Sequence, residues 1–541
     1  MSNLQIDITK CIICDNVVSE VCSGCGKKLY CSKQHMKEDF ASHVTNCCPY
    51  SIVENNVFGR YLIATRDIKA GEIIFKDQPC VLGPRVDIEP ICYNCYTPLY
   101  VPISTCKRCS LVPMCHSCKS ELGHSEEECN IFSNALKDHN KEVILKALGQ
   151  FIVPLRCILK LRNSAHDSKI SKLLSLESHV DERRGTFVWE SHHENVVKKL
   201  HIFGITTMTE KDVEYVQKIC GIVDVNCFEV RGPMGVRGSG QPIRGLYVEA
   251  AMMAHNCVPN IHLSIDDKYE MVVRASSHIP KGEAIVYNYT SPLQRTEIRQ
   301  EHLKEGKYFL CNCKRCTDPT ELATHLSSLM CVRCKTGFVV KRDEKYWGCN
   351  KCEHKCKKEL ICCTITEAEY LFNGTDPTDA RALEKLLMKF AHTLSPNHSI
   401  SLDIKQMLVT LYREVASAKA LQRKIQLCNE ILIVLMTIDP GISRLRGITL
   451  YELHVSLVGL AQIQTNTDEE LKLYTQAEET LRDAIKHLIY EPLHSPEGNL
   501  QRQAMSELKL LRGIIQEKTI YYKENCNNIS SQTRRHNKKK K

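Results

Sequence analysis

Cysteines and histidines in short, repeated spacings are the residues of this chain best suited to do chemistry. Of the 541 residues, 31 are cysteine, and most of these fall in pairs separated by two residues. Thiolates and imidazoles at such spacings are the usual ligands of tetrahedral zinc. A reducing compartment favours metal binding by paired cysteines over disulfide formation. The sequence therefore predicts several structural zinc sites.

The first set of candidate ligands lies in residues 1–48. It resembles a MYND finger, a cross-braced module that holds two zinc ions. The resemblance implies one ion held by Cys11, Cys14, Cys31 and His35, and another held by Cys22, Cys25, His43 and Cys47. The family usually has cysteine where His35 stands, and imidazole is an acceptable replacement because it is also a zinc ligand.

A second set of eight candidate ligands follows in residues 91–130. By the same pairing, one ion takes Cys92, Cys95, Cys115 and Cys118, and the other takes Cys106, Cys109, His124 and Cys129. So short a segment buries little apolar surface, and its metals would supply much of its folding free energy. We expect a second MYND-like finger here.

Two later segments resemble the halves of a SET-type protein-lysine methyltransferase site. The first is His255-Asn256-Cys257, and the second carries Cys311, Cys313 and Cys316. In that family Cys257 and the three later cysteines would share one zinc, which folds the post-SET segment over the cofactor and the substrate-lysine channel.

A further paired unit suits a zinc ribbon, for a predicted total of six zinc ions. Its ligands would be Cys331, Cys334, Cys349 and Cys352, with Cys356, Cys362 and Cys363 left over. The run from Cys311 to Leu322 resembles the divergent arthropod A-type branch of the SET and MYND domain family, which continues with such a further paired-cysteine unit.

The family resemblance also implies S-adenosylmethionine as cofactor and a lysine-containing protein or peptide as substrate. The residues that match its cofactor contacts are Phe58, Gly59, Arg60, Tyr61, Asn226, His255 and Phe309. The catalytic tyrosine falls on Tyr289, with Tyr287 as the alternative if the strand register slips by two residues. Tyr308 is a candidate for a second active-site hydroxyl.

Methyl transfer to lysine requires the neutral amine, whose reference pKa is about 10.4. A narrow, poorly solvated channel favours that neutral form. Tyrosine hydroxyls and backbone carbonyls then align the amine with the methyl group, which is a task of orientation and electrostatics. The zinc ions are structural in this scheme, because four protein ligands leave no open position.

Three residues depart from the family pattern at the places where this chemistry would occur. Ala254 stands where most relatives have an asparagine that contacts the cofactor, and Tyr61 replaces a glycine of the cofactor turn. Lys307 occupies the position of the second active-site tyrosine. Two functions therefore remain open. One is an S-adenosylmethionine-dependent protein-lysine N-methyltransferase with a role in transcriptional regulation. The alternative is a catalytically weak or inactive SET/MYND zinc scaffold that recruits protein partners in gene regulation.

The secondary structure needed to position these residues is that of an α+β protein with several domains. A β-rich SET fold would carry an inserted finger and a mostly helical insertion, in which residues 225–230 match a strand. Leucine and isoleucine stripes after residue 366 predict an all-α domain, similar by family to tetratricopeptide stacks. The expected ranges are 1–48 finger, 49–90 SET, 91–130 second finger, 131–244 SET insertion, 245–295 SET, 296–322 post-SET, 323–365 ribbon, 366–525 helices and 526–541 disordered basic tail.

Composition and charge limit the kinds of binding partner that the protein is expected to have. The chain is 43% hydrophobic and 25% charged, typical of a soluble protein. Of its net charge of +9, six charges lie in the last eight residues, which argues against direct nucleic-acid binding by the body. That end suits an import signal, a phosphate-binding arm or a solubilising tail. No signal peptide or membrane span is expected. We expect an intracellular monomer, in the nucleus or the cytoplasm, with protein partners for the fingers and the helical domain.

Overall fold

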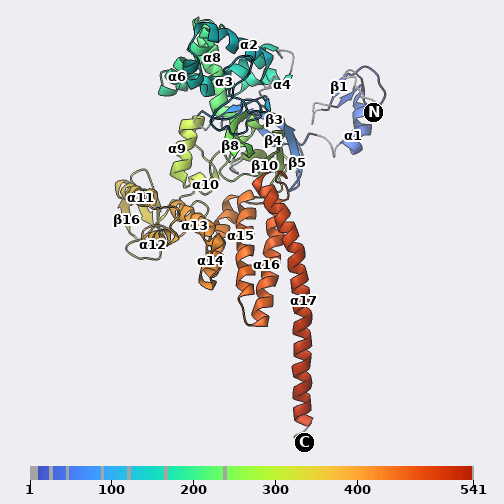
Figure 1. Ribbon diagram of the computed structural model, residues 1–541, viewed down its shortest axis with the longest axis vertical. Helices are drawn as coiled ribbons and strands as arrows, with labels where there is room; N and C mark the ends of the chain where they lie inside the picture. The colour runs from blue at the N-terminus through green and yellow to red at the C-terminus, as the bar shows by residue number, and fades with distance from the viewer. Residues whose placement is uncertain are drawn as a thin grey trace.

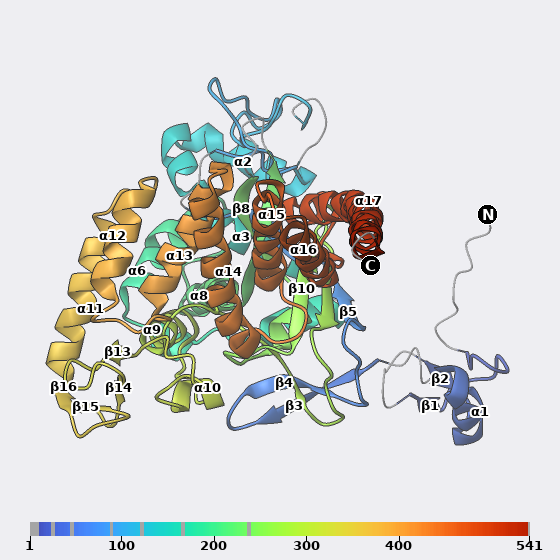
Figure 2. The same ribbon diagram turned by 90° about the horizontal axis from the view of Figure 1, so that it is seen from below.

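The computed structural model describes residues 10–22, 28–43, 48–86, 90–118, 124–163, 168–234 and 240–538. Figure 1 shows a helical insertion at one end, small β-sheets in the middle and long helices at the other end. The first finger stands beside this body, as the view from below in Figure 2 also shows. The arrangement confirms the predicted α+β class with an all-α carboxy-terminal part.

Three small sheets form the centre of the molecule. Their strand orders are β3-β4-β12-β9, β10-β11-β5 and β6-β8-β7. The strands are β3 (Tyr50–Asn55), β4 (Gly59–Ala64), β5 (Ile73–Asp77), β6 (Val81–Pro84), β7 (Cys227–Met234), β8 (Gly240–Leu246), β9 (Ala254–His255), β10 (Ile261–Ile265), β11 (Met271–Ala275) and β12 (Ala284–Tyr287), with the 3₁₀ turn η4 (Ala250–Met252) before β9. Every sheet joins strands from before and after the insertions. The 90–226 segment is therefore an excursion from one continuous β-domain.

The parallel pairing of β9 with β12 fixes the centre of the candidate site. Val286 lies opposite Ala254, and Tyr287 lies opposite His255. The side chain of Asn260 locks this register, because it donates to the Ala284 carbonyl at 2.8 Å and accepts from the Val286 N–H at 2.9 Å. The segment after β9 therefore runs beside the end of β12.

The insertion is mostly helical, as predicted. Its elements are α2 (Glu126–Asp138), α3 (Lys141–Asn163), α4 (Ser168–Ser171), η2 (Lys172–Ser175), α5 (Val180–Arg183), α6 (Phe187–His192), η3 (His193–Val197), α7 (Lys198–Ile202) and α8 (Glu210–Asn226). Helix α3 packs on β6 through the completely buried Val153, whose side chain lies against Gly83. The insertion and the sheets thus share one hydrophobic core.

The strand predicted over 225–230 is wrong at its beginning. Val225 and Asn226 are the last residues of α8, and the strand β7 begins at Cys227. Val216, Ile219 and Val223 recur at helical spacing and are buried, and the Cys227 N–H still donates to the Val223 carbonyl. Helical burial therefore outweighed the local preference of Val225 for a strand.

The second finger and the zinc ribbon are both short segments, and the finger contains little regular secondary structure. The finger has only isolated bridges, Ile91 with Pro98 and Thr105 with Pro113, among its described residues. Past the central sheets come α9 (Thr296–Lys307) and α10 (Lys314–Thr317). The ribbon is an antiparallel sheet of β13 (Leu329–Met330), β14 (Phe338–Lys341), β15 (Tyr346–Cys349) and β16 (Lys355–Lys357).

Long antiparallel helices complete the chain. They are α11 (Lys358–Asn373), α12 (Ala380–Phe390), α13 (Ser399–Leu411), η5 (Tyr412–Glu414), α14 (Ala418–Ile438), α15 (Arg444–Gln462), α16 (Thr467–Leu488) and α17 (Pro496–Lys538). The leucine and isoleucine stripes predicted after residue 366 include one in α16, where Leu481, Ala484, Ile485 and Leu488 are buried. The stack meets the β-domain where the Ile442 N–H donates to the Ser276 carbonyl at 2.8 Å.

The carboxy-terminal end differs from the predicted disordered tail. Helix α17 continues to Lys538 and extends well past its neighbours (Figure 1). Good helix formers such as lysine, glutamine and arginine are frequent along it. The first finger contributes β1 (Glu20–Val21), β2 (Leu29–Tyr30) and α1 (Lys33–His43). Among the described residues, none of these helices combines the length and apolar character needed to cross a membrane.

Candidate functional site

Four sulfurs meet where the post-SET segment reaches the β-domain. The sulfurs of Cys257, Cys311, Cys313 and Cys316 lie within 4.8 Å of one another. A tetrahedral zinc with bonds of about 2.3 Å to sulfur needs sulfurs about 3.8 Å apart. Cys257 is completely buried, so its thiolate is shielded from water. The donor set and its spacing fit a closed structural zinc site, which we call the post-SET cluster.

The structure also brings together four more of the ligand groups that the sequence analysis paired. In each of them the ligand atoms lie within 4.8 Å of one another. They are Cys11, Cys14, Cys31 and His35; Cys92, Cys95, Cys115 and Cys118; Cys106, Cys109, His124 and Cys129; and Cys331, Cys334, Cys349 and Cys352. The chemistry of these donors fits zinc in every case.

The remaining group belongs to the first finger and is described only in part. His43 Nε2 and the Cys22 sulfur lie 3.1 Å apart, as two ligands of one ion can. Cys25 and Cys47, the other two predicted ligands, lie outside the described residues. The six-ion total therefore stays a prediction.

The Cys257 sulfur is also the acceptor for two buried side chains. His255 Nε2 lies 3.3 Å from it, and Arg299 Nε donates to it at 3.3 Å. The other imidazole nitrogen, Nδ1, accepts the backbone N–H of Tyr289 at 3.0 Å. Because that N–H can only donate, Nδ1 is unprotonated and Nε2 carries the hydrogen. His255 thus links the post-SET cluster to the predicted catalytic tyrosine.

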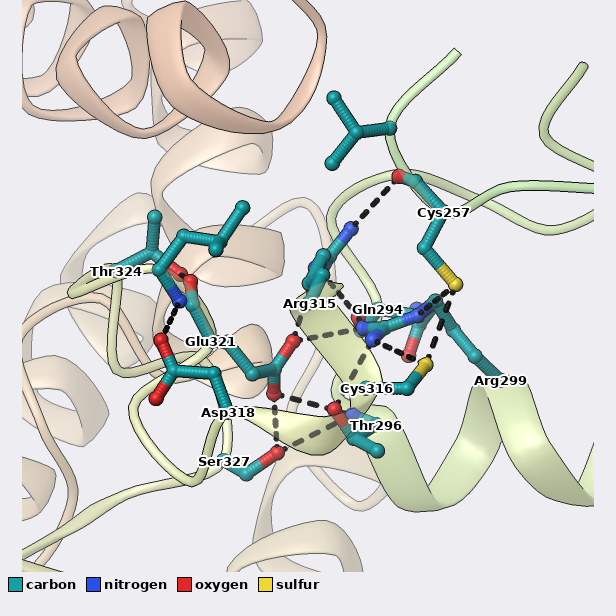
Figure 3. A network of polar contacts seen from close by, with 12 residues as sticks. Cys257, Gln294, Thr296, Arg299, Arg315, Cys316, Asp318, Glu321, Thr324 and Ser327 are labelled. Carbon is teal, nitrogen blue, oxygen red and sulfur yellow. Dashed lines mark hydrogen bonds and ion pairs between the residues drawn. The ribbon is translucent and has the colours of Figure 1, made fainter. Parts of the chain in front are cut away.

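A buried network of ion pairs lies beside Cys257 and Cys316 of the post-SET cluster (Figure 3). The carboxylate of Glu321 accepts from Arg299 at 2.8 Å and from Arg315 at 3.0 Å. It also accepts the Thr296 N–H and the Ser327 hydroxyl. Burial would raise the pKa of Glu321, but the two arginines outweigh burial and hold that pKa below its ordinary value. The network ties the start of α9 to the zinc ligands.

The backbone around Glu321 is strained to make this contact. Glu321, Leu322 and Ala323 have φ angles of 50°, 61° and 62°, in the left-handed region that residues with a Cβ avoid. Consecutive left-handed residues cost about 1–2 kcal/mol each. They persist because the resulting turn aims the carboxylate between the two arginines. This network is not predicted by any pattern in the sequence, apart from the presence of Arg315 between the ligands Cys313 and Cys316.

Aromatic rings form a continuous ladder beside the β9–β12 pair. Its members in order of contact are Tyr247, Phe228, Tyr287, Tyr289, His255 and Phe309. Neighbouring ring centroids lie 5.1 to 6.2 Å apart. Aromatic faces attract cations, and methyl transfer involves both a sulfonium and an ammonium group. The ladder is therefore a surface on which such groups could be held.

The predicted catalytic residue, Tyr289, lies at the centre of this ladder. Its hydroxyl donates to the Met253 carbonyl, and its backbone is held by His255. Burial raises the pKa of Tyr289 far above its ordinary value, so the hydroxyl keeps its proton. Tyr287, the alternative, is the neighbouring rung and pairs with His255 across the strands.

Lys307 and Tyr308 turn to different partners at the end of α9. The Lys307 Nζ lies 5.4 Å from the centroid of the Tyr289 ring. Tyr308 has a φ of 61°, and its ring stacks on His179 of the insertion with centroids 4.9 Å apart. The side chain that meets Tyr289 is therefore Lys307. The proposed role of Tyr308 as a second hydroxyl stays a prediction.

The predicted cofactor residues come from three elements around the ladder. Phe58, Gly59 and Tyr61 lie at the β3–β4 turn, where the Phe58 and Tyr61 rings are 5.0 Å apart. Gly59 has a φ of 64°, and no atom lies within 4 Å of the place where a Cβ would stand. The backbone of that turn is therefore open to a ligand, as a cofactor cradle requires.

The insertion reaches two further cofactor candidates through the segment 175–177. Arg60 donates to the Ser175 carbonyl, and the Asn226 amide donates to the Glu177 carbonyl at 2.7 Å. Asn226 also donates to Ile222 within α8, so its Nδ2 hydrogens are engaged inside the protein. Ala254, which replaces the family's asparagine, is buried opposite Val286. The fit to the cofactor rests on the open turn, His255 and the Phe309 ring.

A hollow of about 320 Å³ adjoins the ladder at Phe228. Its lining carries both charge signs, with Arg85 and Arg244 beside Glu229. A second hollow of about 230 Å³ shares Arg244 with it and adds Asp224 and His192. A larger hollow lies at α2 and Phe203, in the insertion. The two hollows that share Arg244 give a polar surface next to the candidate site.

The chain matches two family models. The SET domain model covers residues 59–290, and the MYND finger model covers residues 11–47. The SET match encloses the second finger and the helical insertion, and it ends just after Tyr289. These matches agree with the nesting of elements seen in the structure.

Several proteins have similar sequences. The SET domain-containing protein SmydA-8, isoform A, of Drosophila melanogaster is 28% identical over 56% of this chain, and the alignment spans 65% of that relative. The histone-lysine N-methyltransferase ASHR1 of Arabidopsis thaliana is 24% identical over 73% of this chain and 83% of its own length. The N-lysine methyltransferase SMYD2-B of Xenopus laevis is 23% identical over 49% and 60%.

The nested SET and MYND matches and the similarity to the Drosophila protein agree with the zinc clusters and the β9–β12 site. On this evidence the chain carries the two domains that name the SET and MYND domain family, and its similarity to the Drosophila protein is consistent with the predicted arthropod A-type branch.

Proposed function

We propose that this protein is an S-adenosylmethionine-dependent protein-lysine N-methyltransferase. The observation that carries the proposal is the aromatic ladder at the β9–β12 pair, where the ring of Tyr289 already holds an alkylammonium group, that of Lys307. A surface that accepts one lysine side chain is suited to accept another. The named activities of the Arabidopsis and Xenopus relatives support the same reaction class.

The cofactor would be held between the β3–β4 turn and the post-SET segment. The turn offers the backbone around Gly59, and the far side offers His255 and the Phe309 ring. When bound, the cofactor supplies an electrophilic methyl group on a sulfonium. The post-SET cluster would keep the segment that carries Phe309 folded over that position.

The residues of the chain would act by orientation and by excluding water. Tyr289 is fixed at its hydroxyl by the Met253 carbonyl and at its backbone by His255. A substrate amine against this ring loses hydration, so its neutral form is favoured. No acid–base pair is needed, because the amine proton can pass to water before the transfer. The two hollows lined by Arg244 would take the residues that flank the substrate lysine.

Lys307 gives specific support to a second candidate function. A lysine of the chain itself lies where an external lysine would have to enter. Together with Ala254 and Tyr61, it favours a weak or inactive SET scaffold that recruits protein partners through its fingers and helices. Under either function we propose a setting in gene regulation, in the nucleus or the cytoplasm, because relatives are named as histone-lysine methyltransferases.

Replacing Tyr289 with phenylalanine is expected to lower kcat by roughly 10²–10³-fold, the usual effect of losing one preorganised polar group in a transition state. The assay would follow transfer of labelled methyl to core histones and lysine peptides by zinc-loaded protein. Tyr412→Phe is the matched control, because the Tyr412 hydroxyl contacts Glu384 in the helical stack. Equal activity of Tyr289→Phe and wild type would remove Tyr289 from the site, and a selective loss in Tyr287→Phe would assign the role to Tyr287.

A further inference from the structure

Lys307 ends α9 with its amine held inside the candidate site. The amine lies over the Tyr289 ring and donates a hydrogen bond to the Val225 carbonyl, the penultimate residue of α8. Its position is fixed from both sides along the chain. Upstream, α9 is anchored by Arg299, and downstream the Phe309 N–H donates to the Leu303 carbonyl. The amine is therefore delivered by a rigid helix rather than by a loose loop.

Among the described residues, the Lys307 amine has no carboxylate at ion-pair distance to balance its charge. No carboxylate of the described residues lies within 4.0 Å of Lys307 Nζ, although Asp224 and the Cys227 thiol face it from farther away. Burial lowers the pKa of Lys307, and the two neighbours offset that effect only in part. A half-buried lysine without an ion-pair partner is costly for stability alone. Its placement therefore calls for a functional explanation.

The geometry places Lys307 where an acceptor amine is required. It rests on the ring of the proposed catalytic tyrosine, and Phe309, two residues later, lies against His255. The helix that carries the amine is continuous with the segment proposed to close over the cofactor. Closure of that segment would thus bring the amine and the cofactor together within one molecule, with a high effective concentration.

We propose that Lys307 is itself a methyl acceptor of this site and is modified in cis. The inference rests on the proposed function. The ammonium first loses a proton to water, and the remaining lone pair of Nζ forms the new N–C bond. The bond between that carbon and the cofactor sulfur breaks, and its electron pair stays on sulfur as a neutral thioether. The Val225 carbonyl holds one N–H and so orients the lone pair. A methylated Lys307 keeps its charge and its contact with Tyr289.

The test uses the full-length, zinc-loaded protein and S-adenosylmethionine with a deuterated methyl group. Lys304 is the matched control, because it is exposed one turn earlier on the same helix. Cleavage after glutamate separates the two lysines, since Glu305 lies between them. Mass spectrometry is expected to find the label on the Lys307 peptide in wild type and not on the Lys304 peptide. The labelled fraction at a fixed time should be unchanged by tenfold dilution, and Tyr289→Phe should reduce it strongly.

A second measurement needs no cofactor. Reductive ¹³C-methylation of the apo protein reports each lysine by NMR, with Lys307→Arg used for assignment. The Lys307 signal is expected to titrate at lower pH in the folded protein than in the protein unfolded in urea, as a desolvated amine should. A Lys307 pKa that unfolding leaves unchanged would overturn the placement on which the inference rests.

The two proposals fail in distinguishable ways. If the protein binds the cofactor and methylates external lysines while Lys307 stays unlabelled, the inference is wrong and the proposed function stands. If calorimetry detects no cofactor binding, the proposed function fails and modification in cis fails with it. Label that appears only at high protein concentration would show transfer between molecules and would also contradict modification in cis.

Discussion

Replacing Cys257 with serine is expected to remove one zinc ion per molecule and to unfold the post-SET segment, residues 296–322. Cys257 is the only ligand of its cluster that comes from the β-domain, so it joins the two parts. Structural zinc contributes roughly 10–16 kcal/mol to folding in isolated zinc modules. The substitution also takes the thiolate acceptor from His255 and Arg299. Both losses fall on the segment that would close over the cofactor.

Metal analysis and limited proteolysis would measure this effect. Wild type is expected to hold six zinc ions and to resist cleavage in α9 and α10, whereas Cys257→Ser should hold five and be cut there. Cys362→Ser is the matched control, because Cys362 is exposed and lies outside every cluster of the described residues. A Cys257→Ser protein with full zinc content and a resistant segment would show that the cluster does not hold this zinc.

Replacing Glu321 with glutamine is expected to destabilise the protein by about 3–5 kcal/mol, the usual result of breaking a buried ionic network from one side. Glutamine has nearly the same shape, so packing is kept while the negative charge is lost. Arg299 and Arg315 are completely or almost completely buried and would remain charged without a counter-ion. The strained turn at 321–323 would also lose the contact that maintains it.

Calorimetric unfolding at constant zinc would show this loss as a lower Tm for the transition that includes the post-SET segment. Glu344→Gln is the control, because the Glu344 carboxylate forms an exposed ion pair with Lys341 on the ribbon hairpin, and its Tm should match wild type. If Glu321→Gln also matches wild type, the network contributes no net stability and another contact must maintain the left-handed turn.

The zinc groups could be predicted because short cysteine spacings in the sequence mark their ligands. A Cys-x2-Cys unit places two thiolates on one turn, and each of the five groups that the structure brings together contains at least one such unit. The leucine and isoleucine stripes predicted after residue 366 are local signals of the same kind. In contrast, the Arg299–Glu321 contact joins residues 22 positions apart through an uncommon left-handed turn. No periodic pattern marks such a pair.

The sequence named candidate residues of the site, but it did not predict how these residues contact one another. The rings of Tyr289 and Phe309 both contact His255, and the roles that the family resemblance implies for these residues stay predictions. The contact of Lys307 with Tyr289 could not be predicted from the sequence. In an extended segment, Lys307 and Tyr308 would point to opposite sides. In the structure, Lys307 instead ends a helix and Tyr308 has a left-handed backbone. Asn226 likewise ends α8, where helical burial decided the conformation.

Calorimetric titration of S-adenosylmethionine into the full-length, zinc-loaded protein measures whether the proposed cofactor site exists. One saturable site per chain is expected. Binding should be weaker in Phe309→Ala, which removes the ring against His255, and unchanged in Phe187→Ala, whose ring is exposed on the insertion. Absence of binding at millimolar cofactor would contradict the methyltransferase proposal and would leave the zinc scaffold as the function of this chain.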